Sequence, residues 1–178
     1  MEYTRRHLIK ASLAFAAVSA VPAFARASLP DFSRSLHFYN THTGESLKTV
    51  YWEQGTYISE ALGDINHILR DHRTGDVKPI DPQLLDVLFK LHARMQSRKP
   101  FEIISGYRSP YSNAMLHERS HGVAKNSLHM QGKAIDIRLI DRPLTALRDA
   151  AIAMQQGGVG YYAASDFVHV DTGRIRRW

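Results

Sequence analysis

The chain has 178 residues, a formal net charge of +6 at pH 7 and no cysteine. The absence of cysteine excludes disulfide bonds and thiolate metal ligands, so any bound metal needs nitrogen and oxygen donors. The basic residues are scattered and form no recognisable nucleic-acid-binding motif, and we therefore expect no nucleic-acid partner.

The N-terminal residues 1–27 have the pattern of a secretory signal. Arg5 and Arg6 precede an apolar, alanine-rich run, and Ala25-Arg26-Ala27 fits an A-x-A cleavage site. Paired arginines at this place are typical of the Tat export route, which leads to the periplasm. A membrane anchor is the alternative, but the run is shorter than the ~20 apolar residues that a spanning helix needs, and Pro22 interrupts it.

Cleavage after Ala27 leaves residues 28–178, a length that suits one compact domain. Four basic residues and Glu2 lie in the removed segment, so the remaining domain keeps a net charge of about +3. We expect no stable membrane span after the signal is cleaved.

The first half of the domain is predicted to form a hairpin and two helices. The strands Ser35–Asn40 and Ser46–Trp52 flank a turn around Gly44, and residues 58–72 have the apolar spacing of a helix. The pair Asp81-Pro82 is a strong helix start, because Asp caps the first turn and Pro suits its first position. An apolar stripe follows at Leu84, Leu85, Leu88, Leu91 and Met95.

The second half is predicted to consist of short strands and two further helices. The expected strands cover 101–105, 133–139, 158–162 and 166–170, and the expected helices cover 113–120 and 143–155, with a polar loop at 121–128. Several late strands have short connections. This order favours an α+β fold with a small, mainly antiparallel sheet and flanking helices over a doubly wound βαβ fold.

Two apolar, strand-like segments carry the candidates for chemistry, with His129 just before the first. Asp136 lies between two isoleucines, where side chains alternate between faces, and a carboxylate buried there is costly unless something pairs with it. It is either such a paired group, for which a metal ion would serve, or a surface position on a half-exposed sheet. His169 and Asp171 share one face of a strand, although a single strand histidine is often structural.

These segments resemble the D-Ala-D-Ala peptidase family of zinc enzymes, and in particular its exported murein endopeptidase branch. The resemblance is carried by Ser127-x-His129, Gly132-x-Ala134-x-Asp136 and Val168-His169-Val170-Asp171-Thr172-Gly173, in this order. The segments 105–110 and 157–161 and the final Arg177-Trp178 also match, so the similarity runs from about residue 34 to the end. It implies the small α+β fold shared by D-Ala-D-Ala peptidases and hedgehog-like domains.

The resemblance implies that His129, Asp136 and His169 bind Zn²⁺ and leave a fourth position for water. Better-known members of the family carry a Glu a few residues before the last histidine, as the base that moves the water's proton. This chain has Asp166 there, with a shorter side chain, and we expect it to be the base. Asp171 is the alternative, either as the base or as a partner that orients a ligand.

Arg108 follows an expected strand in a Gly-Tyr-Arg-Ser-Pro turn. The resemblance implies that it faces the zinc and stabilises the oxyanion or binds a substrate carboxylate, for which a guanidinium is suited. Without the resemblance it would be a surface arginine. Ser127 is similar to a family serine that contacts substrate.

The expected function is that of an exported zinc metallopeptidase that hydrolyses amide bonds in peptidoglycan cross-links, with the stem peptides of murein as its partner. One alternative is a D-alanyl-D-alanine carboxypeptidase. The other is a non-catalytic wall-binding domain stabilised by zinc, which would close the metal site with a fourth protein ligand.

Overall fold

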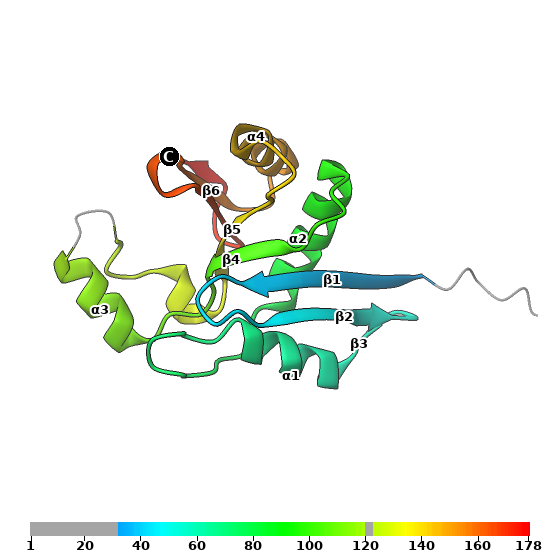
Figure 1. Ribbon diagram of the computed structural model, residues 1–178, viewed down its shortest axis with the longest axis horizontal. Helices are drawn as coiled ribbons and strands as arrows, with labels where there is room; N and C mark the ends of the chain where they lie inside the picture. Colours follow the sequence, from blue (N-terminus) through cyan, green and yellow to red (C-terminus); the bar gives the residue numbers. More distant parts are fainter. Residues whose placement is uncertain (1–31, 120–122) are drawn as a thin grey trace, which may run out of the picture.

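The computed structural model describes residues 32–119 and 123–178, so the predicted signal over residues 1–27 lies outside the described residues. Within these ranges, eight strands form one sheet in the order β3-β2-β1-β4-β5-β7-β6-β8 (Figure 1). The strands are β1 (Ser33–Asn40), β2 (Ser46–Glu53), β3 (Thr56–Tyr57), β4 (Phe101–Ser105), β5 (Ala134–Arg138), β6 (Gly158–Tyr162), β7 (Phe167–Asp171) and β8 (Arg176–Arg177). The helices are α1 (Ser59–Ile68), α2 (Pro82–Met95), α3 (Pro110–Arg119) and α4 (Leu144–Met154), with 3₁₀ helices η1 (Leu128–Gln131) and η2 (Ala163–Ser165).

The pairing of the strands confirms the predicted α+β fold with a mainly antiparallel sheet. Only β1 with β4 and β6 with β8 run parallel, and the remaining neighbours among the described strands are antiparallel. Helix α3 projects at one end of the molecule, away from the helices that cover the sheet (Figure 1). No helix of the described ranges is long and apolar enough to cross a membrane.

The predicted hairpin and the start of the second helix are confirmed. Strands β1 and β2 pair in an antiparallel ladder, and Pro82 is the first residue of α2. The Asp81 side chain accepts a hydrogen bond from the Gln83 N–H, which satisfies one of the free N–H groups of the first turn. All five residues of the predicted apolar stripe are buried.

Several predicted boundaries are wrong, because caps and contacts between distant segments decide where an element begins and ends; α3, for example, begins at Pro110 instead of residue 113. Helix α1 ends at Ile68 instead of residue 72, and the Leu69 carbonyl accepts the Tyr107 N–H at 2.7 Å. Strand β7 begins at Phe167, since Asp166 has a left-handed φ of +53° that ends η2. Strand β7 is also not the last strand, because β8 follows it and pairs with β6.

A single hydrophobic core fixes the centre of the sheet. Residues Ile135 and Ile137 of β5 and Val168 and Val170 of β7 are nearly inaccessible and belong to one cluster with the apolar faces of α1, α2 and α4. Because successive side chains on a strand point to opposite faces, the residues between these four lie on the other side of the sheet. The burial of the apolar face therefore determines which side chains the other face presents.

Asp71, just after α1, anchors the turn that follows β4. Its buried carboxylate accepts hydrogen bonds from the backbone N–H groups of Ser109 (2.8 Å) and Arg73 (2.9 Å). Burial alone would raise the pKa of Asp71, but the neighbouring Ser112 hydroxyl and these backbone hydrogen bonds stabilise the charged form and lower the pKa to about 2. The turn that carries Arg108 is thus tied to the end of α1 through one carboxylate.

Asp71→Asn is expected to lower the free energy of unfolding by about 1–3 kcal/mol at pH 7, because the two bonds go to different oxygens and the amide NH2 group cannot accept one of them. The folded-state pKa lies below the ordinary value of 3.8, so this contribution is present above about pH 4 and is lost as the pH falls toward 2. Denaturant unfolding of both proteins across this pH range measures the difference. Asp64→Asn, on the exposed face of α1, is the matched control. Equal stability of wild type and Asp71→Asn at pH 7 would contradict the prediction.

Candidate metal centre and active site

Two of the candidate ligands come from neighbouring strands. Asp136 of β5 and His169 of β7 are directly paired in the antiparallel ladder, and both side chains lie on the face opposite the hydrophobic core. Both are buried, with 5 % and 8 % of their surfaces exposed. The sheet therefore places a carboxylate and an imidazole beside each other without help from any loop.

His129 is brought to the same place by η1, the 3₁₀ turn that precedes β5. The Ser127 side chain caps η1 by accepting the His129 N–H, and Gly132 ends it with a left-handed φ of +68°. A Cβ at Gly132 would lie 2.3 Å from the Pro79 carbonyl oxygen, so only glycine fits both the backbone conformation and the space. This short turn fixes the direction of the His129 ring.

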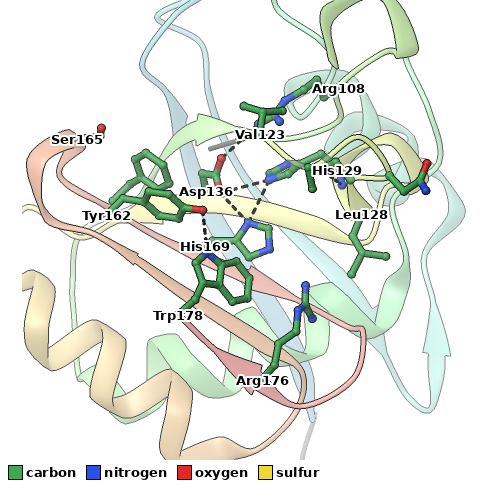
Figure 2. Close-up of a pocket in the computed structure, with 14 residues that line it drawn as sticks. Arg108, Val123, Leu128, His129, Asp136, Tyr162, Ser165, His169, Arg176 and Trp178 are labelled. Atoms are coloured by element: carbon green, nitrogen blue, oxygen red, sulfur yellow. Dashed lines mark hydrogen bonds and ion pairs between the residues drawn. The ribbon is translucent and has the colours of Figure 1, made fainter. Parts of the chain in front are cut away.

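The three side chains converge on one point. His129 Nε2 lies 3.2 Å from His169 Nδ1 and 3.2 Å from Asp136 Oδ1, and His169 Nδ1 lies 2.9 Å from the same oxygen. Figure 2 shows the three groups pointing toward one another at the floor of a pocket. In the described part of the chain, they form a group that could hold a metal ion.

The outward-facing nitrogens of both rings have acceptors of their own. His129 Nδ1 lies 2.7 Å from the Gly106 carbonyl oxygen, and His169 Nε2 lies 2.9 Å from Asp171 Oδ2. If these nitrogens carry the ring protons, the converging nitrogens present lone pairs. Two imidazole nitrogens and one carboxylate oxygen with such supporting hydrogen bonds are a donor set that fits zinc.

The charges of the site shift its pKa values in opposite directions. Burial alone would raise the pKa of Asp136, but His129 and His169 hold it well below its usual range. Burial alone would lower the pKa of His169, but the carboxylates of Asp136 and Asp171 raise it. Burial lowers the pKa of Arg108 while Asp136 opposes that shift. The site is therefore a largely buried cluster in which carboxylates and nitrogen groups shift one another's pKa values against the effect of burial.

Arg108 lies beside the three converging side chains. Its Nη2 is 3.6 Å from Asp136 Oδ2, its side chain is 11 % exposed, and its buried Nε has no hydrogen-bond partner in the described part of the protein. Arg108 and Ser127 both line the pocket around His129, which has a volume of about 510 Å³. The pocket thus contains a permanently charged group with unused donors beside the three converging ligands.

Asp171 is at the site but is fully enclosed. One of its oxygens accepts from the backbone N–H groups of Gly158 and Gly173, and the other pairs with His169 and with Arg176 Nη2 at 2.7 Å. Burial alone would raise its pKa, but these partners hold it well below its usual range. Such a saturated, inaccessible carboxylate is suited to orient His169 and is poorly placed to take a proton from water.

Asp166 is not brought to the site. Its side chain is 63 % exposed and pairs with Arg138 at 3.0 Å, and it lines a separate depression with Leu139 and Arg142. The left-handed turn at Asp166 directs the side chain away from the pocket, although His169 follows only three residues later. The geometry therefore does not support the predicted role of Asp166 as the base.

Comparison with known proteins agrees with this geometry. Residues 29–178 match the family model described as peptidoglycan L,D-endopeptidase MepK. The chain belongs to this family. It is 47 % identical to MepK of Escherichia coli K12 over 163 residues, covering 92 % of this chain and 89 % of that protein. The probable MepK of Haemophilus influenzae is 40 % identical over 146 residues, 82 % of this chain and 78 % of the other.

The match confirms the predicted membership of the D-Ala-D-Ala peptidase family in its murein endopeptidase branch. That residues 28–178 form the mature domain stays a prediction. The individual roles of the site residues stay predictions.

Sequence reasoning missed three side chains that form one wall of the pocket. They are Tyr162, Arg176 and Trp178, and all three line the pocket together with the ligand group (Figure 2). The pairing of β6 with β8 brings the end of the chain to this place. The final Arg177-Trp178 belonged to the family resemblance, but nothing in its spacing indicated that Trp178 would contact the His169 ring, at 5.2 Å between ring centroids.

Asp171→Asn is expected to lower the affinity for Zn²⁺ about 10–100-fold, because the anion that holds the His169 proton is removed. Isothermal titration of the metal-free protein with Zn²⁺ measures this change. Asp166→Asn is the matched control and should bind Zn²⁺ as the wild type does, since its side chain lies outside the pocket. A larger loss in Asp166→Asn than in Asp171→Asn would refute this assignment.

Proposed function

We propose that this chain is an exported zinc metallopeptidase that hydrolyses peptide cross-links in peptidoglycan, the activity in the name of its MepK relatives. One observation carries the proposal: two imidazole nitrogens and a carboxylate oxygen converge at the floor of an open pocket, beside a buried arginine with unused donors. This combination is suited to the hydrolysis of a neutral amide, which develops negative charge on its carbonyl oxygen.

His129, Asp136 and His169 would hold the zinc ion. Bound zinc would activate a water molecule and polarise the scissile carbonyl group. Asp171 would keep the His169 ring in one orientation and one tautomer, and the Gly106 carbonyl would do the same for His129. The three donors belong to a rigid sheet and a capped turn, so the protein supplies a site that needs little rearrangement.

Arg108 would stabilise the oxyanion that forms from the amide carbonyl. Its guanidinium is held near Asp136 by a long ion pair and a 3.4 Å hydrogen bond to Ser105, which leaves donors for a substrate oxygen. Ser127 lines the same pocket, and its hydroxyl would bind the substrate backbone while its oxygen continues to cap η1. Asp171 is proposed to orient His169 and not to act as the base, because it is inaccessible and both of its oxygens already accept hydrogen bonds.

The two rival functions lack comparable support. A structural zinc site usually has four protein ligands, whereas the group found among the described residues has three and opens into a pocket. A carboxypeptidase has no support from the names of the relatives, which are endopeptidases of the L,D type. We therefore propose the L,D bond between two diaminopimelate residues as the bond that is cut.

The site of action is proposed to be the periplasm. The Tat-type pattern over residues 1–27 and the location of peptidoglycan outside the cytoplasmic membrane both support export. Export by this route would follow folding in the cytoplasm, so the zinc site could be assembled before translocation.

Purified protein is expected to convert muropeptide dimers with diaminopimelate–diaminopimelate cross-links into monomers, with Zn²⁺ required. Removal of the metal with EDTA should abolish the cleavage, and Zn²⁺ should restore it. His169→Ala should lower the rate at least ~10³-fold, because it removes a ligand. Mass spectrometry of the separated products measures both effects.

Dimers joined by D-Ala–diaminopimelate bonds serve as the control substrate, since the same peptides are then linked through a D,D bond. Loss of only a terminal alanine would identify a carboxypeptidase instead. If zinc-loaded, folded protein cleaves neither dimer, the endopeptidase proposal is wrong and the wall-binding alternative gains support.

Arg108→Lys is expected to lower kcat about 10²–10³-fold, because a lysine keeps the charge but loses the planar pair of donors that an oxyanion requires. Steady-state cleavage of the same dimers gives the ratio. Arg94→Lys, on the exposed surface of α2, is the matched control. Full activity of Arg108→Lys would show that charge alone suffices, against the proposed role.

A further inference from the structure

Outside the candidate ligands and the two arginines, the described residues that line the pocket offer few groups that could take part in the reaction. Among the described residues that line it, Asp136 is the one carboxylate, and it belongs to the ligand group. Asp166 and Asp171 do not line it. Besides Ser127 and Ser165, the remaining hydroxyl is that of Tyr162, which ends on the side of the pocket where Asp136 and His169 lie (Figure 2).

The Tyr162 hydroxyl is held in a defined orientation. Its oxygen accepts a hydrogen bond from Trp178 Nε1 at 2.8 Å, and its ring stacks on Phe167 with centroids 4.5 Å apart. An indole N–H can only donate, so the tyrosine oxygen acts as the acceptor in this bond. The tyrosine O–H therefore keeps its proton for another partner, and no acceptor for it occurs within residues 32–119 and 123–178.

Trp178 is itself fixed from three sides. Its indole lies against Gly160, where an added Cβ would come within 2.7 Å of the ring. The Arg176 guanidinium lies 4.8 Å from the ring centroid, and the backbone of Trp178 pairs with Val159 and Tyr161. The donor that orients Tyr162 thus belongs to the β6–β8 edge, where its indole packs against Gly160 while half of the residue's surface stays exposed.

We propose that Tyr162 is a catalytic hydrogen-bond donor, which binds the carbonyl oxygen of the scissile amide as that oxygen becomes an oxyanion. This inference rests on the proposed function. Arg108 lies across the pocket from the Tyr162–Trp178 wall, so the two donors would approach the substrate from different sides (Figure 2). Donors oriented before the reaction need no rearrangement when the charge develops, which makes them effective in a partly dry site.

The reaction balances without a proton from Tyr162. The water oxygen bonds to the carbonyl carbon, the C–N bond breaks, and the leaving nitrogen receives a proton that came from the water. The phenol keeps its own proton throughout and contributes a hydrogen bond that is stronger to the oxyanion than to the ground-state carbonyl.

Tyr162→Phe tests the proposal, with Tyr161→Phe as the matched control. Tyr161 is the neighbouring residue on β6, and its ring faces Arg148 in a separate depression. In the dimer assay, Tyr162→Phe should lower kcat about 10²-fold with KM changed less than about threefold, since the lost interaction belongs to the transition state. Tyr161→Phe should keep the wild-type kcat. An undiminished kcat in Tyr162→Phe would overturn the proposal.

Binding gives a readout that does not depend on turnover. A phosphinate analogue of the cross-linked peptide carries a tetrahedral, anionic group in place of the scissile amide, and Tyr162→Phe should weaken its binding by a factor similar to the loss in kcat. The affinity for Zn²⁺ should be that of the wild type. Unchanged phosphinate affinity, or a parallel loss of Zn²⁺, would show that Tyr162 does not act as proposed.

The orientation of the hydroxyl can be tested without substrate. The chain has two tryptophans, so a ¹⁵N-labelled sample gives two indole N–H resonances, of which Trp178→Phe identifies one. Tyr162→Phe should shift the Trp178 resonance and leave the Trp52 resonance unchanged. Tyr161→Phe should shift neither resonance strongly. An unmoved Trp178 resonance would remove the basis of the inference. If the wild type cleaves no dimer, the proposed function fails, whereas an active wild type with an equally active Tyr162→Phe rejects the inference alone.

Discussion

The register between β5 and β7 is the constraint on which the site depends. Asp136 faces His169 across this ladder, while the isoleucines and valines on either side of them enter the core. A slip of either strand by one residue would turn its own Asp136 or His169 toward the core and move its two apolar neighbours out of the core, so the hydrophobic effect penalises any other register. The burial that stabilises the fold thereby also positions two candidate ligands, and neither needs an additional loop or cap to hold it in place.

The third ligand depends on a different type of support. His129 is on a 3₁₀ turn, and its position follows from a serine cap, a glycine with a left-handed φ and a hydrogen bond to the Gly106 carbonyl. Gly106 belongs to the turn that also carries Arg108, which Asp71 ties to the end of α1. Backbone polar contacts thus connect the ligand, the arginine and the helix, and a change in any of them would reach the site through short, directional bonds.

The sequence predicted those features that follow from local periodicity. The alternation around Asp136 and His169 indicated strands with a polar face, and the Asp81-Pro82 pair gave the start of α2, because these patterns report burial and capping over a few residues. The orientation of Asp166 could not be predicted from such local patterns. The family resemblance indicated a base a few residues before His169, but Asp166 has a left-handed backbone conformation, which the apolar pattern does not reveal, and its side chain pairs with Arg138. Contacts between distant segments, such as Trp178 with His169, likewise have no local signal.

The pocket is therefore built from two parts with different origins. Its floor consists of Asp136 and His169, which the central ladder positions, and of His129, which the capped turn η1 positions, and these three are the candidate metal ligands. Its wall comes from the last residues of the chain, where β8 adds to the edge of the sheet through β6 and brings Arg176 and Trp178 beside His169. A substitution at this edge can change the shape and hydrogen bonding of the wall while the β5–β7 register keeps the ligands together. For this reason the selection of a substrate can vary on such a fold independently of the metal chemistry, since the core specifies only the floor.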